Sequence, residues 1–205
     1  MKVTEIMAAH KWSNNAALIA DVISLGFIHG DILDATYGLG RFWSKCRPEG
    51  LVTNDKYTEA DFNFDFTSFP HEWGSKFDSV VFDPPYKLNG TSTLESDVPY
   101  GVHKPATVEE RLDLIVAGAI ECLRLVKKGG FFLVKVQNQV SSGRMHFQTD
   151  ILTQALNARK VAQMHLLTNP RPQPKGRRQI HPRSNYSTLM IFKKENDDDP
   201  FKEDE

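Results

Sequence analysis

The stretch from residue 79 to 86, Ser-Val-Val-Phe-Asp-Pro-Pro-Tyr, constrains the fold more than any other, because an apolar strand runs directly into two prolines. Proline fixes its own φ and has no backbone N–H, and the residue before a proline is pushed into an extended conformation. Asp83 and Pro84 therefore cannot continue into a helix, and we expect the strand to end with unpaired carbonyl groups. An ordinary turn that closes a strand uses the same residue types, so this stretch alone leaves both interpretations open.

The residues of this turn have the chemistry needed to bind a flat group that carries an amine. An exocyclic amino group of a nucleobase donates two hydrogens, which the Asp83 carboxylate and the Pro84 carbonyl can accept. Accepting both draws the nitrogen from planar towards tetrahedral geometry and frees its lone pair. The ring of Tyr86 offers a face on which an unstacked base can rest. The candidate catalytic residues are Asp83, Pro84, Pro85 and Tyr86.

Strands and helices alternate around this turn, which is typical of an α/β fold. The expected strands are 31–36, 51–56, 77–82, 131–136, 161–167 and 187–192, and the expected helices are 16–27, 108–127 and 146–158. Gly129 and Gly130 are expected to stop the second helix. A long loop rich in proline and arginine joins the last two strands, which indicates an antiparallel pair at the sheet edge.

Composition favours one globular domain of 205 residues, with 40% apolar residues, 25% charged residues and a formal net charge of -1. We expect this domain to span residues 1–194, followed by a disordered acidic tail at 195–205. The two cysteines and seven histidines lie at spacings that suggest neither zinc binding nor a disulfide framework, so no metal site is expected. No signal-like or membrane-length apolar segment is found, and we expect a cytoplasmic location.

A second motif follows the first expected strand. Gly38 and Gly40 permit a tight turn and a close approach of backbone to ligand at the crevice of a doubly wound sheet. Asp55, at the end of the next strand, can accept two hydrogen bonds from a ribose diol. Trp43 stands where a dinucleotide-binding pattern has its third glycine. This pattern therefore favours a nucleoside ligand without a diphosphate.

A further acid, Asp65, is followed by the aromatic residue Phe66. The carboxylate can accept a hydrogen bond from an adenine amino group while the ring packs nearby. The local sequence fits an N-cap or turn aspartate equally well.

Taken in order, these motifs resemble those of S-adenosylmethionine-dependent amino-methyltransferases. The resemblance rests on Asp34 to Gly40 (Asp-Ala-Thr-Tyr-Gly-Leu-Gly), Asp55, Asp65-Phe66 and the Asp-Pro-Pro-Tyr turn, and it covers roughly residues 30–137. It is strongest to the DNA adenine-N6 methyltransferases, whose members use Asp-Pro-Pro-Tyr. It implies a Rossmann-like seven-stranded sheet with the last strand antiparallel, and S-adenosyl-L-methionine as cofactor.

The resemblance also implies roles for single residues. The methionine end of the cofactor would lie against Asp34, Gly38 and Gly40, the ribose against Asp55, and the adenine against Asp65 and Phe66. The full set of candidate cofactor-binding residues is Asp34, Thr36, Gly38, Gly40, Asp55, Lys56, Asp65 and Phe66. Residues 10–13 (His-Lys-Trp-Ser) can complete such a pocket, or can simply begin a helix with one packing tryptophan.

Two irregular segments are candidates for substrate binding. The stretch that begins at Lys87 and runs to residue 107 is interpreted as a flap over the target base, with a simple insertion as the alternative. The loop 169–184 is extended by its prolines, and its cations can neutralise phosphates, although solvated surface charge would look the same. The candidate cations are Lys87, Arg171, Lys175, Arg177 and Arg178. Lys135, Gln137 and Asn138 also reach the crevice side, as positioning residues or as ordinary turn residues.

These observations favour direct transfer of a methyl group to an exocyclic amine, because neither cysteine follows a proline at a strand end, as methylation at pyrimidine C5 would require. Adenine N6 in DNA is the favoured target, with nucleic acid as the partner. An amino group in ribosomal or transfer RNA is the first alternative. A nucleic-acid-binding module that keeps the fold without transfer is the second.

Overall fold

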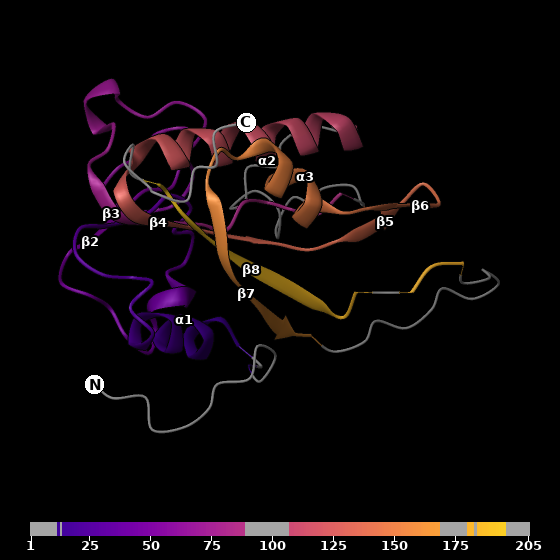
Figure 1. The fold of residues 1–205 in the computed structure, drawn as a ribbon, viewed down its shortest axis with the longest axis horizontal. Coiled ribbons are helices and arrows are strands. Elements are labelled where there is room, and N and C mark those ends of the chain that lie inside the picture. Colours follow the sequence, from indigo (N-terminus) through magenta and orange to yellow (C-terminus); the bar gives the residue numbers. More distant parts are fainter. Residues whose placement is uncertain (1–11, 13, 89–106, 169–179, 183, 196–205) are drawn as a thin grey trace.

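The computed structural model describes residues 12, 14–88, 107–168, 180–182 and 184–195, which form an α/β structure around one main sheet (Figure 1). The sheet has six strands in the order β2-β1-β3-β4-β8-β7. Its strands are β1 (Ile32–Asp34), β2 (Leu51–Thr53), β3 (Phe77–Phe82), β4 (Val126–Val136), β7 (Arg159–Leu167) and β8 (Tyr186–Lys193). The first four are parallel, and β8 is antiparallel to both β4 and β7. The α/β class, the antiparallel last strand and the antiparallel edge pair are confirmed.

The described part of the sheet has six strands where the resemblance implied seven. After β2 the chain makes one isolated parallel bridge, between Asn54 and Phe62, in place of a strand. The Asn54 side chain supplies hydrogen bonds that strand pairing would otherwise make here. Its Nδ2 donates to the carbonyls of Ala35 and Phe64, and its Oδ1 accepts from the Phe64 N–H. The segment continues as turns to a short 3-10 helix, η2 (His71–Trp73).

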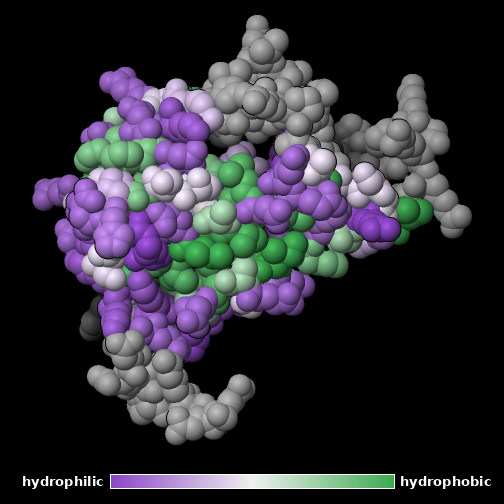
Figure 2. All heavy atoms as spheres, turned by 90° about the horizontal axis from the view of Figure 1, so that it is seen from above, coloured by the Kyte–Doolittle hydropathy of each residue, from purple (hydrophilic) through white to green (hydrophobic). Residues whose placement is uncertain are grey.

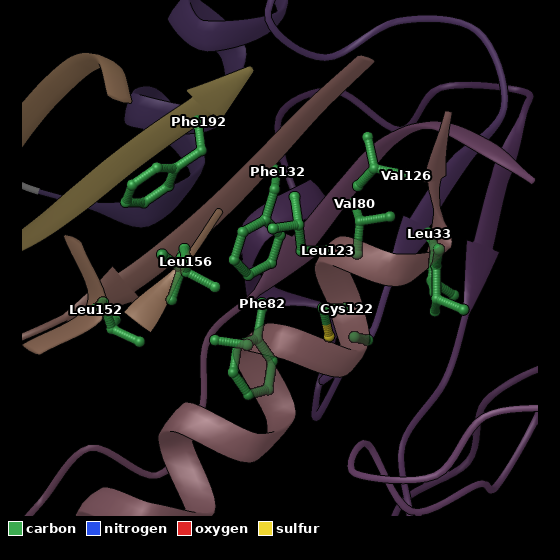
Figure 3. Close-up of a cluster of buried hydrophobic side chains, with 14 of the residues drawn as sticks. Leu33, Val80, Phe82, Cys122, Leu123, Val126, Phe132, Leu152, Leu156 and Phe192 are labelled. Atoms are coloured by element: carbon green, nitrogen blue, oxygen red, sulfur yellow. The ribbon is translucent and has the colours of Figure 1, made fainter. Parts of the chain in front are cut away.

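Helices cover both faces of the sheet. Helix α1 (Asn15–Ser24) lies on one face, and α2 (Val108–Leu125) and α3 (Gln148–Ala155) lie on the other (Figure 1). Side chains therefore alternate along each buried strand: Val80 and Phe82 join the core beneath α2, whereas Val81 joins the core beneath α1. Figure 3 shows the α2 side of this core. Burial on both faces explains why the last three residues of β3, Val80 to Phe82, are all apolar.

The two longer helices start at residues that satisfy their first N–H groups. Asn14 accepts from the Ala17 N–H through its side chain. Thr107 and Glu110 form a reciprocal capping box at the start of α2. Viewed from the side of α2, apolar side chains form a band between polar ones (Figure 2). The exposed large apolar residues include Leu114 and Ile120 of α2.

Several element boundaries differ from the sequence prediction. Helix α2 ends at Leu125, and β4 begins directly at Val126, with Gly129 at a φ of 78° inside the strand. Helix α3 begins at Gln148, because the preceding residues form a hairpin, β5 (Gln139–Ser141) and β6 (Arg144–His146). The two residues of its turn, Ser142 and Gly143, have φ values of 49° and 76°, as a tight hairpin turn requires. No helix in the described ranges is long and apolar enough to cross a membrane.

Candidate active site

The proposed catalytic turn and the glycine turn lie side by side, because they follow neighbouring parallel strands. The backbone N–H of Asp83, directly after β3, donates over 2.8 Å to Oγ1 of Thr36, which lies two residues after the end of β1. A second hydrogen bond joins the same two segments, from the Ala35 N–H to the Val81 carbonyl. The carboxyl ends of parallel strands meet at one edge of a sheet, which is where such folds bind ligands.

The Asp83 carboxylate is paired with a lysine from the next strand. Lys135 Nζ, on β4, lies 3.1 Å from Asp83 Oδ1 and 3.3 Å from Oδ2. The Lys135 side chain is only 4% exposed, and that of Asp83 is 24% exposed. Lys135 was predicted from sequence to reach the crevice, and the structure identifies the carboxylate that it contacts.

The electrostatics of this pair follow from its burial. Burial raises the pKa of Asp83, and the Lys135 ammonium opposes that rise. Burial lowers the pKa of Lys135, but the neighbouring Asp83 and Tyr86 outweigh it, so the lysine pKa lies above its ordinary value. We therefore expect Lys135 to be charged and to favour the ionised form of Asp83.

Tyr86 is held by its backbone as well as its side chain. Its carbonyl accepts from Gln148 Nε2 over 2.9 Å and from Gln139 Nε2 over 3.2 Å. Its hydroxyl lies 3.4 Å from Lys135 Nζ, which also stands 5.0 Å from the centre of the ring. Burial raises the pKa of Tyr86. Two glutamines that no sequence motif marked thus hold the backbone of the residue whose ring is proposed as a base platform.

The prediction that β3 ends with unpaired carbonyl groups is wrong for one of them, the carbonyl of Pro84. The Tyr86 N–H folds back and donates to the Pro84 carbonyl over 2.7 Å. A carbonyl oxygen has two lone pairs, so this oxygen keeps capacity for one more donor. Pro84 itself is buried, and Pro85 is half-buried.

The glycine turn leaves space beside its backbone. Gly38 and Gly40 have φ values of 55° and 67°. A Cβ added to Gly38 would meet no atom within 4 Å, whereas one added to Gly40 would meet the Tyr37 hydroxyl at 2.5 Å. The Gly38 N–H donates to Asp55 Oδ2 over 2.8 Å, which ties the turn to the end of β2.

Asp34 is a buried carboxyl group beneath this turn. Its Oδ1 accepts from the Thr36 N–H over 3.0 Å, and its Oδ2 accepts from Trp43 Nε1 over 2.6 Å. Burial raises the pKa of Asp34 to about 7, against the opposing effect of the Trp43 hydrogen bond. The residue in the place of the third glycine therefore contacts a candidate cofactor residue.

Asp55 already accepts three backbone N–H groups. Besides Gly38, Tyr57 and Thr58 both donate to its Oδ1 over 2.9 Å. A carboxylate has about four lone-pair positions, so about one remains for an incoming hydroxyl. Its ribose contact stays a prediction.

Asp65 has the turn geometry that was the alternative to adenine binding. Its Oδ1 accepts from the Thr67 N–H and hydroxyl, and its Oδ2 pairs with Lys56 Nζ over 2.7 Å. These hydrogen bonds keep the pKa of Asp65 low, against the raising effect of burial. Phe66 packs edge-on against Phe82, with ring centres 5.2 Å apart. Adenine binding by this pair stays a prediction.

Several predicted residues do not join this cluster or lie outside the described residues. Lys87 is exposed, and its carbonyl accepts from Arg111. Trp12 is buried, and its Nε1 donates to Asp21, which matches the packing role rather than an open pocket wall. The described residues do not include most of the proposed flap, nor residues 196–205 of the predicted acidic tail. They also leave out four of the candidate cations, Arg171, Lys175, Arg177 and Arg178. Within the described ranges, no three His, Cys, Asp or Glu side chains form a group that could hold a metal ion.

Comparisons with known proteins find distant structural neighbours and no sequence family. No protein-family model matches the chain, and no curated protein matches it. Among solved structures, the N-methyltransferase NodS from Bradyrhizobium japonicum WM9 is similar at 10% identity over 88% of this chain and 94% of its own, with a TM-score of 0.48. TrmN from Thermus thermophilus is 12% identical over 86% of this chain and 48% of its own, with a TM-score of 0.49.

Some neighbours were solved with a cofactor. A proposed DNA modification methylase, also from Thermus thermophilus and in complex with S-adenosyl-L-methionine, is 18% identical over 64% of this chain and 52% of its own, with a TM-score of 0.41. NodS was also solved with S-adenosyl-L-homocysteine. The chain spans about half the length of the two Thermus proteins. Similarity this low assigns neither a ligand nor a substrate to this chain.

Proposed function

We propose that this protein is an S-adenosyl-L-methionine-dependent methyltransferase that acts on an exocyclic amine of a nucleobase, with adenine N6 in DNA as the first target. One observation carries the proposal. The Asp83 acceptor turn stands directly beside the glycine turn, joined through the hydrogen bond to Thr36. An acceptor for an amine and a backbone open to a nucleoside therefore share one edge of the sheet.

The residues present fit such a cofactor. Space beside Gly38 admits a ligand close to the backbone. Asp34, a buried carboxyl with a pKa of about 7, can ionise when a cationic group binds nearby. S-adenosyl-L-methionine supplies an activated sulfonium methyl group, so the protein needs no nucleophilic side chain of its own.

The chain's own residues then orient the amine. Asp83 and the remaining lone pair of the Pro84 carbonyl accept its two hydrogens, and Tyr86 supports the flat ring. The sulfur–carbon bond breaks as the nitrogen–carbon bond forms, and the proton of the methylated amine leaves to water. In-line positioning and exposure of the lone pair provide the catalysis.

Nucleic acid is the proposed partner, with DNA favoured over RNA. The proposal depends on the cation-rich loop at 169–184, which neutralises phosphates with release of counterions. The experiment that tests the function is incubation with radiolabelled cofactor and separate DNA and RNA pools, followed by nucleoside analysis. Label in N6-methyladenine from DNA is the expected result. Label in RNA alone would mean that the substrate is RNA and not DNA. Binding of the cofactor without label in either pool would favour a non-catalytic nucleic-acid-binding module.

A substitution at Gly38 tests the cofactor site without any activity assay. Gly38→Ala places a methyl group in the open space beside the turn and is expected to weaken cofactor binding by on the order of tenfold or more, measured by calorimetry. The strain of a positive φ adds a stability cost of about 1 kcal/mol.

Gly26→Ala is the matched control, because Gly26 also has a positive φ, 82°, and open space around its would-be Cβ, but lies at the end of α1. Both variants should lose similar stability, and only Gly38→Ala should lose affinity. Equal affinities in the two variants would remove the glycine turn from the cofactor site.

A further inference from the structure

We infer that Lys135 is a positioning residue for the proposed amine acceptor, holding both oxygens of Asp83 and the Tyr86 hydroxyl in one fixed arrangement. The inference rests on the proposed function, because the role of Asp83 as acceptor does. The sequence offered Lys135 as a candidate positioning residue at the crevice but identified neither Asp83 nor Tyr86 as its partner.

The contacts of Lys135 account for its whole ammonium group. An ammonium has three N–H donors, and three oxygens surround this one: the two Asp83 carboxylate oxygens at 3.1 and 3.3 Å, and the Tyr86 hydroxyl at 3.4 Å. The aromatic rings of Tyr86 and Phe42 lie 5.0 and 5.6 Å from Nζ. With a side chain only 4% exposed, Lys135 is enclosed by the residues it orders.

The pairing register across the sheet makes this arrangement rigid. Phe82 pairs with Val134 in the parallel ladder between β3 and β4, so the next residue of each strand is Asp83 and Lys135. Lys135 lies within β4, and Asp83 follows directly on the last residue of β3, so the buried sheet holds the backbone from which both side chains start. A carboxylate held in this way is already oriented for an incoming amine, so binding the amine costs less side-chain entropy.

Lys135 also supplies positive charge beside Asp83. The charged or titratable groups that act on Asp83 are Lys135 from β4, Tyr86 from its own turn and the buried Asp34 from the end of β1. Lys135 is the cation among these groups. Without it, Asp83 would face a carboxyl group and a phenol in a desolvated site, and it would take up a proton at higher pH. A protonated Asp83 loses acceptor capacity for the amine.

The test measures Asp83 itself. Carboxyl carbon NMR on the ligand-free protein, with Asp83→Asn to assign the signal, gives the Asp83 titration midpoint in wild type, Lys135→Met and Lys135→Arg. We expect the midpoint to rise by about one pH unit or more in Lys135→Met and to stay within about half a unit in Lys135→Arg. The acidic limb of the pH–rate profile for methyl transfer should move by the same amount.

An unmoved midpoint in a folded Lys135→Met protein would overturn the inference, even if the variant is less stable or slower at every pH. If Lys135→Met and Lys135→Gln both fail to fold, the nitrogen NMR signal of Lys135 in wild type decides instead. It should remain that of an ammonium to higher pH than the signal of an exposed lysine, and it should shift as Asp83 titrates. Independence from Asp83 would overturn the inference. The NMR result does not depend on methyl transfer, so failure of the proposed function is seen separately, as wild type without transfer.

Discussion

Asp83→Asn is expected to lower the rate of methyl transfer by about a thousand-fold while leaving cofactor affinity within about twofold of wild type. Asparagine keeps the shape of the side chain but replaces one acceptor oxygen by an NH2 donor, which meets the donor hydrogens of the amine unfavourably. Loss of one preorganised hydrogen-bonding group at a reacting centre typically costs about a hundred- to a thousand-fold. Single-turnover transfer and calorimetric cofactor binding measure the two effects.

The choice of asparagine follows from Lys135. Asp83→Ala would leave the buried ammonium with neither a countercharge nor an acceptor oxygen at this position, whereas asparagine keeps one acceptor oxygen; breaking a buried ion pair on one side costs about 3 to 5 kcal/mol of stability. A loss of transfer in that variant could therefore reflect unfolding. The double variant Asp83→Asn with Lys135→Met removes the orphaned charge, and it should recover stability without recovering transfer.

The matched control for Asp83→Asn is Asp78→Asn, on the same strand. Asp78 also pairs with a lysine, Lys127, over 2.9 Å, but it lies towards the opposite end of β3. Transfer should be unchanged in this variant. An Asp83→Asn protein that keeps a tenth or more of wild-type transfer, or loses cofactor binding in parallel with transfer, would contradict the role of Asp83.

The strands could be predicted where local signals coincide with burial. Strand β3 spans Phe77–Phe82 as predicted, because an apolar run buried on both faces is followed at once by Asp83 and two prolines. The start of β4 could not be placed, because Gly129 and Gly130 look like a helix stop. In the structure they lie within a strand, where Gly130 packs so close to the Asp78 carbonyl that a Cβ would stand 2.6 Å away.

The meeting of the two turns could be predicted, since neighbouring parallel strands end at one edge. The partners within the site could not. Sequence places Lys135 near a strand end, but the register that sets it beside Asp83 depends on the pairing of β3 with β4. The backbone N–H groups of Tyr57 and Thr58 that occupy Asp55 come from a loop. The glutamines that hold the Tyr86 carbonyl come from the hairpin and from the first residue of α3, and no local pattern specifies how these elements meet the turn.

The buried Asp34 carboxyl is expected to make the protein less stable as pH rises from about 4 to about 7. Its pKa is about 7 in the folded protein, against 3.8 ordinarily, so the folded state binds a proton that the unfolded state has lost. The stabilising effect of that proton is complete below about pH 4 and is lost as pH rises through about 7. Asp34 alone should lower the free energy of unfolding by about 4 kcal/mol over this range, because each unit of pKa difference between the folded and unfolded states contributes about 1.4 kcal/mol.

Urea unfolding at a series of pH values measures this loss, and Trp43 supplies the comparison that isolates Asp34. The indole N–H favours the ionised carboxyl, so Trp43→Phe should raise the Asp34 pKa further and carry the fall in stability to higher pH. Asp34→Asn in the Trp43→Phe background gives a side chain that does not titrate, with its oxygen free to accept from the Thr36 N–H. The difference between these two variants should grow between pH 4 and 7, because only one of them has the titrating group. Parallel stability curves would mean that Asp34 is already ionised at low pH, and its proton could not then be displaced by a cationic ligand at the glycine turn.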